Sequence, residues 1–150
     1  MIAVIQTTQL VLIGLLAGEE LIMRYGVQPA LDSLPDSAHV HARIALVKRL
    51  KIVVPIIMAP TVVVSVGLLI VAGADDGLAW RVAGLAALIG FLLFSLLGTV
   101  PINMKVNDWN PQEPPEDWRR VAHRWETIDT FRSGAAMLSF VFFAIAAQVP

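Results

Sequence analysis

Hydrophobic residues along this chain gather in four long runs that are separated by more polar connections. The runs cover residues 2–25, 52–74, 78–102 and 131–149. Each run is close to the ~20 residues that an α-helix needs to cross a hydrocarbon layer of ~30 Å. Strands of a membrane barrel would instead alternate apolar and polar residues over ~10 positions, and these runs do not alternate. The pattern predicts an all-α fold, an integral membrane four-helix bundle built by residues 1–150 as a single membrane domain.

The amino-acid composition agrees with this pattern and indicates which partners the protein has. Hydrophobic residues make up 57% of the chain and charged residues only 15%, whereas a soluble domain has about 25% charged residues. The excess apolar surface has to face lipid or other subunits, so the lipid bilayer is the first predicted partner. With 11 Lys and Arg against 12 Asp and Glu, the chain lacks the basic character of a nucleic-acid-binding domain.

The positions of the basic residues predict the orientation. All but one of the 11 Lys and Arg residues lie in or beside the two longer connections, residues 26–51 and 103–130, and the exception is Arg81. Loops rich in Lys and Arg stay on the cytoplasmic side. We therefore expect a multi-pass protein of the inner (plasma) membrane, with both of these connections cytoplasmic and both termini outside.

The connections also contain helix signals. Asp36 or Ser37 is suited to cap a helix that continues into the second run. Pro115 suits a first helical position, and the acidic residues after it favour a helix N-terminus. The fourth helix is therefore expected to begin near Glu116 and to extend into the cytoplasm before it enters the membrane past Arg132.

Ionisable residues near the ends of the apolar runs are the first candidates for function, because each costs about 2.5–3.5 kcal/mol at membrane depth. Glu20 and Arg24 are four residues apart with the acid first, the favourable order for an ion pair on a helix. This pair either offsets two charges at a helix end or also lines a polar site. Glu19 and Glu20 point about 100° apart on a helix, and we expect Glu20 to face the interior.

Two further pairs lie at a similar depth. Asn103 and Asn107 follow the third run, where they either cap its helix or join helices by hydrogen bonds. Asp129 and Arg132 share a helical stripe with Trp125. They form either an interfacial ion pair beside an aromatic anchor or part of a functional site. Packed inward, these groups would form a pocket that is open to the cytoplasm and accepts a hydrophobic small molecule.

Other classes of site find little support. The chain has no cysteine, and its histidines, His39, His41 and His123, all lie outside the four runs. His39 and His41 fall on different faces of a helix, and we expect all three to be solvated. We therefore predict no metal, haem or other bound cofactor. A helix face with Gly84, Gly90 and Gly98 favours self-association into a homo-oligomer.

Short motifs across most of the chain resemble one known family. They are Thr99–Asn103, Val106–Asn107, Trp109, Pro114–Trp118, Arg124–Glu126 and Arg132, and Gly18–Glu20 with Arg24 fits the same pattern. The chain thus resembles the anthrone oxygenase-like family of small four-helix integral membrane proteins. Some fungal relatives oxidise anthrones to anthraquinones with oxygen and no known cofactor. Many relatives carry a histidine where this chain has Asp129.

The resemblance implies a cofactor-independent oxygenase or oxidoreductase that acts on a hydrophobic, anthrone- or phenol-like substrate. Asp129 would be the base, or else Glu20, although a carboxylate beside an arginine is a weak base. Arg132, Arg24 and Asn103 would stabilise the enolate or phenolate. The residues expected to bind substrate are Glu20, Arg24, Asn107, Trp109 and Trp125. The alternative is a non-catalytic binding protein, or an accessory subunit of a membrane complex, in which the polar residues serve helix packing.

Overall fold

The computed structural model describes residues 1–149, and they fold into four long helices that are apolar enough to cross a membrane. The first is built from α1 (Ile2–Ile22), a π-helical turn (Met23–Val27) and α2 (Gln28–Asp32), and the second is α3 (Asp36–Ala72). The third is built from α4 (Leu78–Leu93), a second π-helical stretch (Phe94–Thr99) and α5 (Val100–Asn107), and the fourth is α6 (Trp118–Ala146). Among the described residues there is no strand, so the predicted all-α membrane bundle is confirmed.

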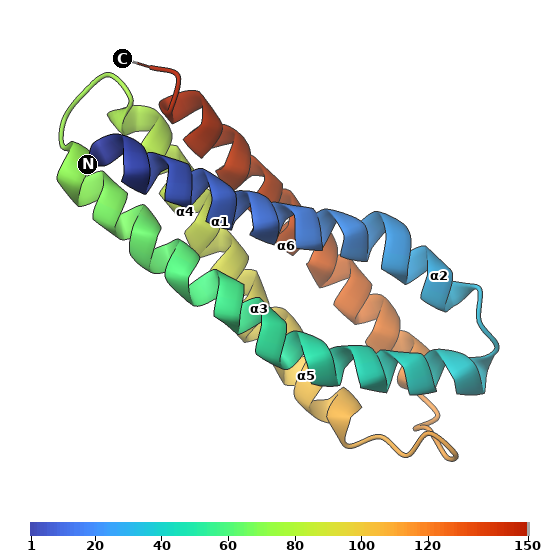
Figure 1. Cartoon of the computed structure of the whole chain (residues 1–150). Helices are drawn as coiled ribbons and strands as arrows, with labels where there is room; N and C mark the ends of the chain where they lie inside the picture. Colours follow the sequence, from blue (N-terminus) through green and yellow to red (C-terminus); the bar gives the residue numbers. More distant parts are fainter. Residues whose placement is uncertain (150) are drawn as a thin grey trace.

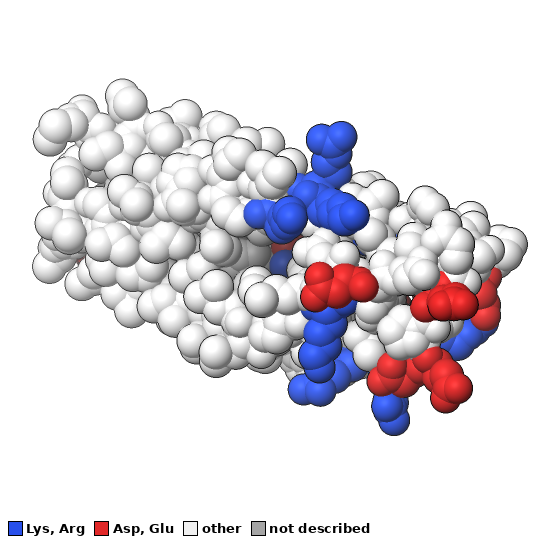
Figure 2. Space-filling model, turned by 90° about the horizontal axis from the view of Figure 1, so that it is seen from below, with Lys and Arg blue, Asp and Glu red and all other residues white. Residues whose placement is uncertain are grey.

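The chain runs up and down, so the two termini and the turn between α3 and α4 lie at the same end (Figure 1). The connections 33–35 and 108–117 lie at the opposite end, which we call the polar end. The helices are longer than the apolar runs because they continue past them at this end. With 37 residues, α3 is about 55 Å long, whereas a hydrocarbon layer is about 30 Å thick. In Figure 2 the charged side chains gather toward the polar end, and the other end carries almost none.

Two helix starts differ in detail from the prediction. Neither Asp36 nor Ser37 caps α3, because the helix begins directly after Pro35 with no side-chain cap. The fourth helix begins at Trp118 rather than near Glu116. A turn precedes the helix, and in this turn the Trp118 backbone N–H donates to the Pro115 carbonyl at 3.0 Å.

The half of the bundle away from the polar end is closely packed. Its buried core contains Ile13, Leu16, Leu88, Phe91 and Ala136. Where α4 crosses α6, a Cβ on Gly84 would lie 2.8 Å from Cδ2 of Phe143, so only glycine allows this approach. The Ser139 hydroxyl donates to the Gly84 carbonyl at 2.8 Å and joins the same two helices.

These contacts correct the prediction of a free glycine face on the third helix. Gly84 meets Phe143 inside the bundle, and a Cβ on Gly98 would lie 2.6 Å from Ile128 Cγ2. Both glycines therefore serve packing within one chain. Gly90 has open space beside it.

Candidate functional site

A buried arginine is the centre of the polar cluster. Arg132 projects from α6 with 4% of its surface exposed, while Glu20 is 0% and Asp129 1% exposed. Its Nη2 lies 2.9 Å from Glu20 Oε1 and 2.9 Å from Asp129 Oδ1. Its Nε also donates to Asp129 Oδ1 at 3.2 Å. One guanidinium thus holds carboxylates from two helices, α1 and α6.

Aromatic rings fix the guanidinium in place. The Arg132 Cζ lies 5.6 Å from the Phe91 ring centroid and 5.8 Å from the Trp125 centroid, both within the range of a cation–π contact. Trp125 is fixed in turn, because its indole N–H donates to Asn103 Oδ1 at 2.9 Å. Asn103 therefore joins the third and fourth helices by a hydrogen bond, one of the two roles that its sequence position allowed.

The expected ion pair between Glu20 and Arg24 is not formed. Glu20 faces the interior, as predicted, but pairs with Arg132, and Arg24 donates to the Ser133 hydroxyl at 3.3 Å. Arg24 lies in the π-helical turn Met23–Val27, where the wider turn displaces side chains from the α-helical register. Glu19 is half-buried, and both of its carboxylate oxygens are buried without a hydrogen bond among residues 1–149.

A cavity of about 280 Å³ lies beside Arg132, between α3, the third helix and α6. Its lining residues are Leu50, Lys51, Val54, Pro55, Met58, Ser95, Leu96, Thr99, Val100, Asn103, Met104, Asn107, Trp125 and Arg132. Apolar side chains form most of the wall, and the polar ones come mainly from one stripe of the third helix. Pro55, Leu96, Val100 and Met104 are exposed on the outer surface, which places an opening on the side of the bundle.

The predicted site residues thus divide into three groups. Asn103, Asn107, Trp125 and Arg132 line the cavity together. Glu20 and Asp129 contact Arg132 but are not part of the wall. Arg24 and Trp109 are not in the wall either, and Trp109 packs against the apolar core of the polar end, next to residues such as Val106.

Two hydroxyl residues of the wall were missed from the sequence. Ser95 and Thr99 precede Asn103 and Asn107 in a series with a spacing of four residues. Each hydroxyl donates to a backbone carbonyl one turn earlier, Ser95 to Phe91 at 2.8 Å and Thr99 to Ser95 at 3.2 Å. A polar residue at every fourth position of an otherwise apolar run was the signal that could have revealed this wall.

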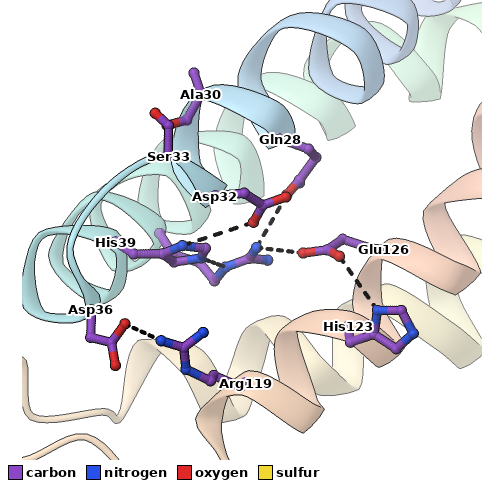
Figure 3. Close-up of polar contacts among 10 residues, drawn as sticks. Gln28, Ala30, Asp32, Ser33, Asp36, His39, Arg119, His123 and Glu126 are labelled. Carbon is purple, nitrogen blue, oxygen red and sulfur yellow. Dashed lines mark hydrogen bonds and ion pairs between the residues drawn. The ribbon is translucent and has the colours of Figure 1, made fainter.

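A second polar network lies nearer the polar end, and Figure 3 shows Gln28, His39 and Glu126 within it. Arg43, 3% exposed, donates from Nη2 to Gln28 Oε1 at 3.1 Å and to Glu126 Oε1 at 3.0 Å. Its Nε donates to His39 Nε2 at 3.1 Å. His39 is 5% exposed and its ring lies 5.0 Å from that of Trp118.

His39 corrects the expectation that all three histidines are solvated, because the polar ends of α3 and α6 pack together over it. His41 and His123 are exposed. A hollow beside this network is lined by Asp32, Asp36, His39, Arg119, His123 and Glu126, with Leu34, Trp118 and Ala122. Within residues 1–149 no group of three or more His, Asp or Glu side chains is arranged to hold a metal ion.

Fold and site together define a multi-pass helical membrane protein with an arginine-centred cavity toward one end of the bundle. The model of the anthrone oxygenase family matches residues 45–142, more than half of the chain, and the protein belongs to that family. The match covers the parts of α3, the third helix and α6 that line the cavity. No curated protein and no solved structure matches the chain.

Proposed function

We propose that this protein binds a lipophilic phenol- or anthrone-like molecule in the cavity beside Arg132 and oxidises it with dioxygen. The observation that carries the proposal is the division of the cavity wall into an apolar part and a cluster of fixed polar groups. Membership in the anthrone oxygenase family supports the reaction class. The opening on the side of the bundle gives a membrane-dissolved molecule a route that avoids water.

Hydrogen-bonding groups on the wall are available to such a ligand. The Asn103 amide oxygen accepts from Trp125, so its two N–H donors are free for the cavity. Asn107 Oδ1 is buried without a partner among residues 1–149, and an unpaired buried acceptor costs about 1–3 kcal/mol. A ligand hydroxyl that donates to Asn107 would remove this cost, and a ligand carbonyl would accept from Asn103 or Arg132.

The same donors suit the chemistry. When an anthrone loses a proton from its CH₂ group, negative charge moves to the carbonyl oxygen, and fixed donors there stabilise the resulting enolate. Dioxygen takes two electrons from the enolate and forms a C–O bond at the former CH₂ carbon, which gives a hydroperoxide. Loss of the second CH₂ hydrogen as a proton then supplies two more electrons from the C–H bond and breaks the O–O bond. One oxygen atom becomes the new carbonyl and the other leaves as water with the two protons, so anthrone and O₂ give anthraquinone and H₂O.

In this scheme Arg132 and Asn103 are the catalytic residues that bind the oxyanion. Asp129 contacts Arg132 through both Nε and Nη2 and is absent from the cavity wall, so we assign it a positioning role. The substrate proton passes to water beside the exposed Lys51, at the end of the cavity nearer the polar end. Asn107 and Trp125 complete the binding surface.

The test is anthrone oxidation by the purified protein in lipid nanodiscs, followed as oxygen uptake and anthraquinone absorbance above the rate with heat-inactivated protein. Asn103→Ala and Arg132→Lys should each lower kcat at least about 100-fold, the usual scale for loss of an oxyanion donor. The matched control is Lys48→Gln, an exposed change outside the cavity. Wild-type turnover no faster than background would contradict the oxygenase.

One observation favours a second candidate, a non-catalytic binding protein. Among residues 1–149, the cavity wall contains no Asp, Glu or His, so none of these residues offers a general base to the bound molecule. Ligand retention through purification without turnover, lost in Asn103→Ala, would establish this alternative. Retention without turnover would also be expected of an accessory subunit that presents the ligand to an enzyme.

We also propose that the polar end faces the cytoplasm, in the inner membrane, which the distribution of Lys and Arg supports. The chain has no cysteine, so a single introduced cysteine is the only thiol that a labelling reagent can modify. Asn110→Cys should be labelled by an impermeant reagent only after permeabilisation, and Asp76→Cys should be labelled in intact cells. Gly77 is unsuitable, because a Cβ there would lie 2.9 Å from Arg81 Nη1. The reverse labelling would place the polar end outside.

A further inference from the structure

The cavity wall carries charge of one sign. In the described part of the chain, its ionisable lining residues are Lys51 and Arg132, and no carboxylate lines the wall. The charge of Arg132 is balanced behind the wall by Glu20 and Asp129, each 2.9 Å from Nη2. Lys51 has no ion-pair partner among the described residues. The uncompensated charge of this cavity is therefore the ammonium group of Lys51.

Lys51 differs from its basic neighbours in position. Lys48 and Arg49 are exposed, as is Lys51, but neither lines the cavity. Lys51 shares the stripe of α3 that forms the apolar wall, since Val54, Pro55 and Met58 follow it at spacings of three, four and seven residues. Seven residues of α-helix extend about 10 Å, so Lys51 stands at the end of an apolar wall of that length.

We propose that the ligand of this cavity is an amphiphilic anion, a fused-ring aromatic body with an acid group of its own, and that Lys51 selects it by pairing with that acid. The inference rests on the proposed function and narrows its substrate class. The aromatic body packs against Val54, Met58 and Leu96. A neutral oxygen at the other end of the ligand bonds to Asn103 and Arg132.

Charge balance fixes this orientation. An acid group placed at Arg132 would occupy the donors that the ligand oxygen needs when it becomes the enolate oxyanion, on a guanidinium that Glu20 and Asp129 already share. An acid group at Lys51 meets an unpaired positive charge in a partly solvated position. Opposite charges at the rim favour binding and guide entry. The ligand therefore enters the cavity with its neutral end leading.

The test compares two probes that differ in one group, anthraquinone-2-carboxylate and anthraquinone-2-carboxamide. Their Kd values are measured by quenching of tryptophan fluorescence, with the full chain in nanodiscs of neutral phosphatidylcholine. Wild type should bind the carboxylate about fivefold more tightly than the amide, the scale of a partly exposed ion pair. In Lys51→Gln the two affinities should become equal, and Lys51→Arg should restore the preference.

Lys48→Gln is the matched control, because it removes a neighbouring positive charge from the same helix without touching the cavity wall. The proposal is overturned if wild type does not distinguish the probes, or if Lys48→Gln reduces the preference as much as Lys51→Gln does. The second result would assign the effect to general attraction of anions to the basic residues of the polar end. A preference that persists in Lys51→Gln would equally overturn it.

Failure of the proposed function gives a different pattern. If the cavity binds aromatic ligands but Lys51 is not selective, both probes bind wild type equally and both are lost in Asn103→Ala. If the cavity binds no aromatic ligand, neither probe quenches wild type, which contradicts both the proposed function and the selection by Lys51. Repeating the titration in nanodiscs with anionic phosphatidylglycerol separates the ligand's acid from a lipid headgroup. A headgroup that occupies Lys51 would abolish the carboxylate preference there, whereas a ligand that displaces it would keep the preference.

Discussion

The two halves of this bundle are stabilised in different ways. Away from the polar end, α4 and α6 approach over Gly84, and a core of Ile13, Leu16 and Leu88 leaves none of these residues exposed. The half toward the polar end has an apolar core too, around Val106, but its helices are also joined through Arg132 and Arg43, each bound to side chains of other helices. The cavity lies in this second half. Close apolar packing leaves no room for a ligand, whereas groups held apart by hydrogen bonds and ion pairs leave a space with directed donors.

The difference has an energetic side. A packed apolar contact is weakened in proportion to the atoms that are removed. A buried ion pair responds asymmetrically, because removing one partner leaves a charge without compensation. Arg132 has two carboxylate partners, so losing the guanidinium and losing one carboxylate should have very different effects.

Arg132→Met should destabilise the protein most, by about 3–5 kcal/mol, because Glu20 and Asp129 would both remain buried without a cation. Glu20→Gln should cost much less, since Asp129 still pairs with the guanidinium. Adding Glu20→Gln to Arg132→Met should recover part of the loss. Thermal unfolding in detergent, followed by circular dichroism, measures all three. Equal melting temperatures for the two single variants would show that Arg132 contributes no more to the stability of this half than Glu20 does.

In the closely packed half, Gly84→Ala should destabilise by about 1–3 kcal/mol, because the added methyl group has to displace the Phe143 ring. The clash follows from the 2.8 Å separation between the new Cβ and Phe143 Cδ2. Gly90→Ala is the matched control on the same helix, where the new Cβ meets open space. It should be neutral, or stabilising by up to about 1 kcal/mol, because alanine is the better helix former. Equal effects at the two positions would mean that the α4–α6 contact is loose.

Much of the fold follows from the sequence, because the length and polarity of each apolar run are local properties. The inward position of Glu20 and the pair of Asp129 with Arg132 were also predicted, since charges in apolar runs are few and costly. The partner of Glu20 was not predicted. The π-helical turn Met23–Val27 moves Arg24 out of the α-helical register, and no local sequence pattern predicts such a turn.

The burial of His39 was missed for a different reason. It depends on how far the helices extend past the membrane and on their packing over Trp118, both of which are properties of the assembled bundle. Ser95 and Thr99 were missed because single hydroxyl residues are common in membrane helices, where they bond to their own backbone. Their spacing of four residues relative to Asn103 and Asn107 places all four side chains on one stripe of the helix. That this stripe lines a cavity becomes clear only once the structure shows the cavity.

In the half toward the polar end, Asn103→Ala should destabilise by about 1–3 kcal/mol, because it leaves the Trp125 indole N–H buried without an acceptor. Trp125→Phe removes the donor, so the double variant should lose less than the sum of the two single changes. The coupling energy from this cycle, taken from unfolding curves, measures the 2.9 Å hydrogen bond between the two side chains. Strict additivity would mean that the indole N–H finds another acceptor.

The smallest effect is expected at the end opposite the cavity, where the exposed Asp75 pairs with the buried Arg81. The hydrogen bond from Arg81 holds the pKa of the Asp75 carboxyl below its usual value. A lowered pKa in the folded state means that the pair stabilises the fold above the usual pKa and is lost as the pH falls through the folded value. The melting temperature of wild type should therefore fall on acidification below about pH 4, and Asp75→Asn should remove this part of the pH dependence while leaving ligand affinity unchanged.

Asp76→Asn is the control, because the neighbouring carboxylate has no ion-pair partner among the described residues. If both variants alter the acid limb equally, the effect belongs to the net charge of this turn and not to the pair with Arg81.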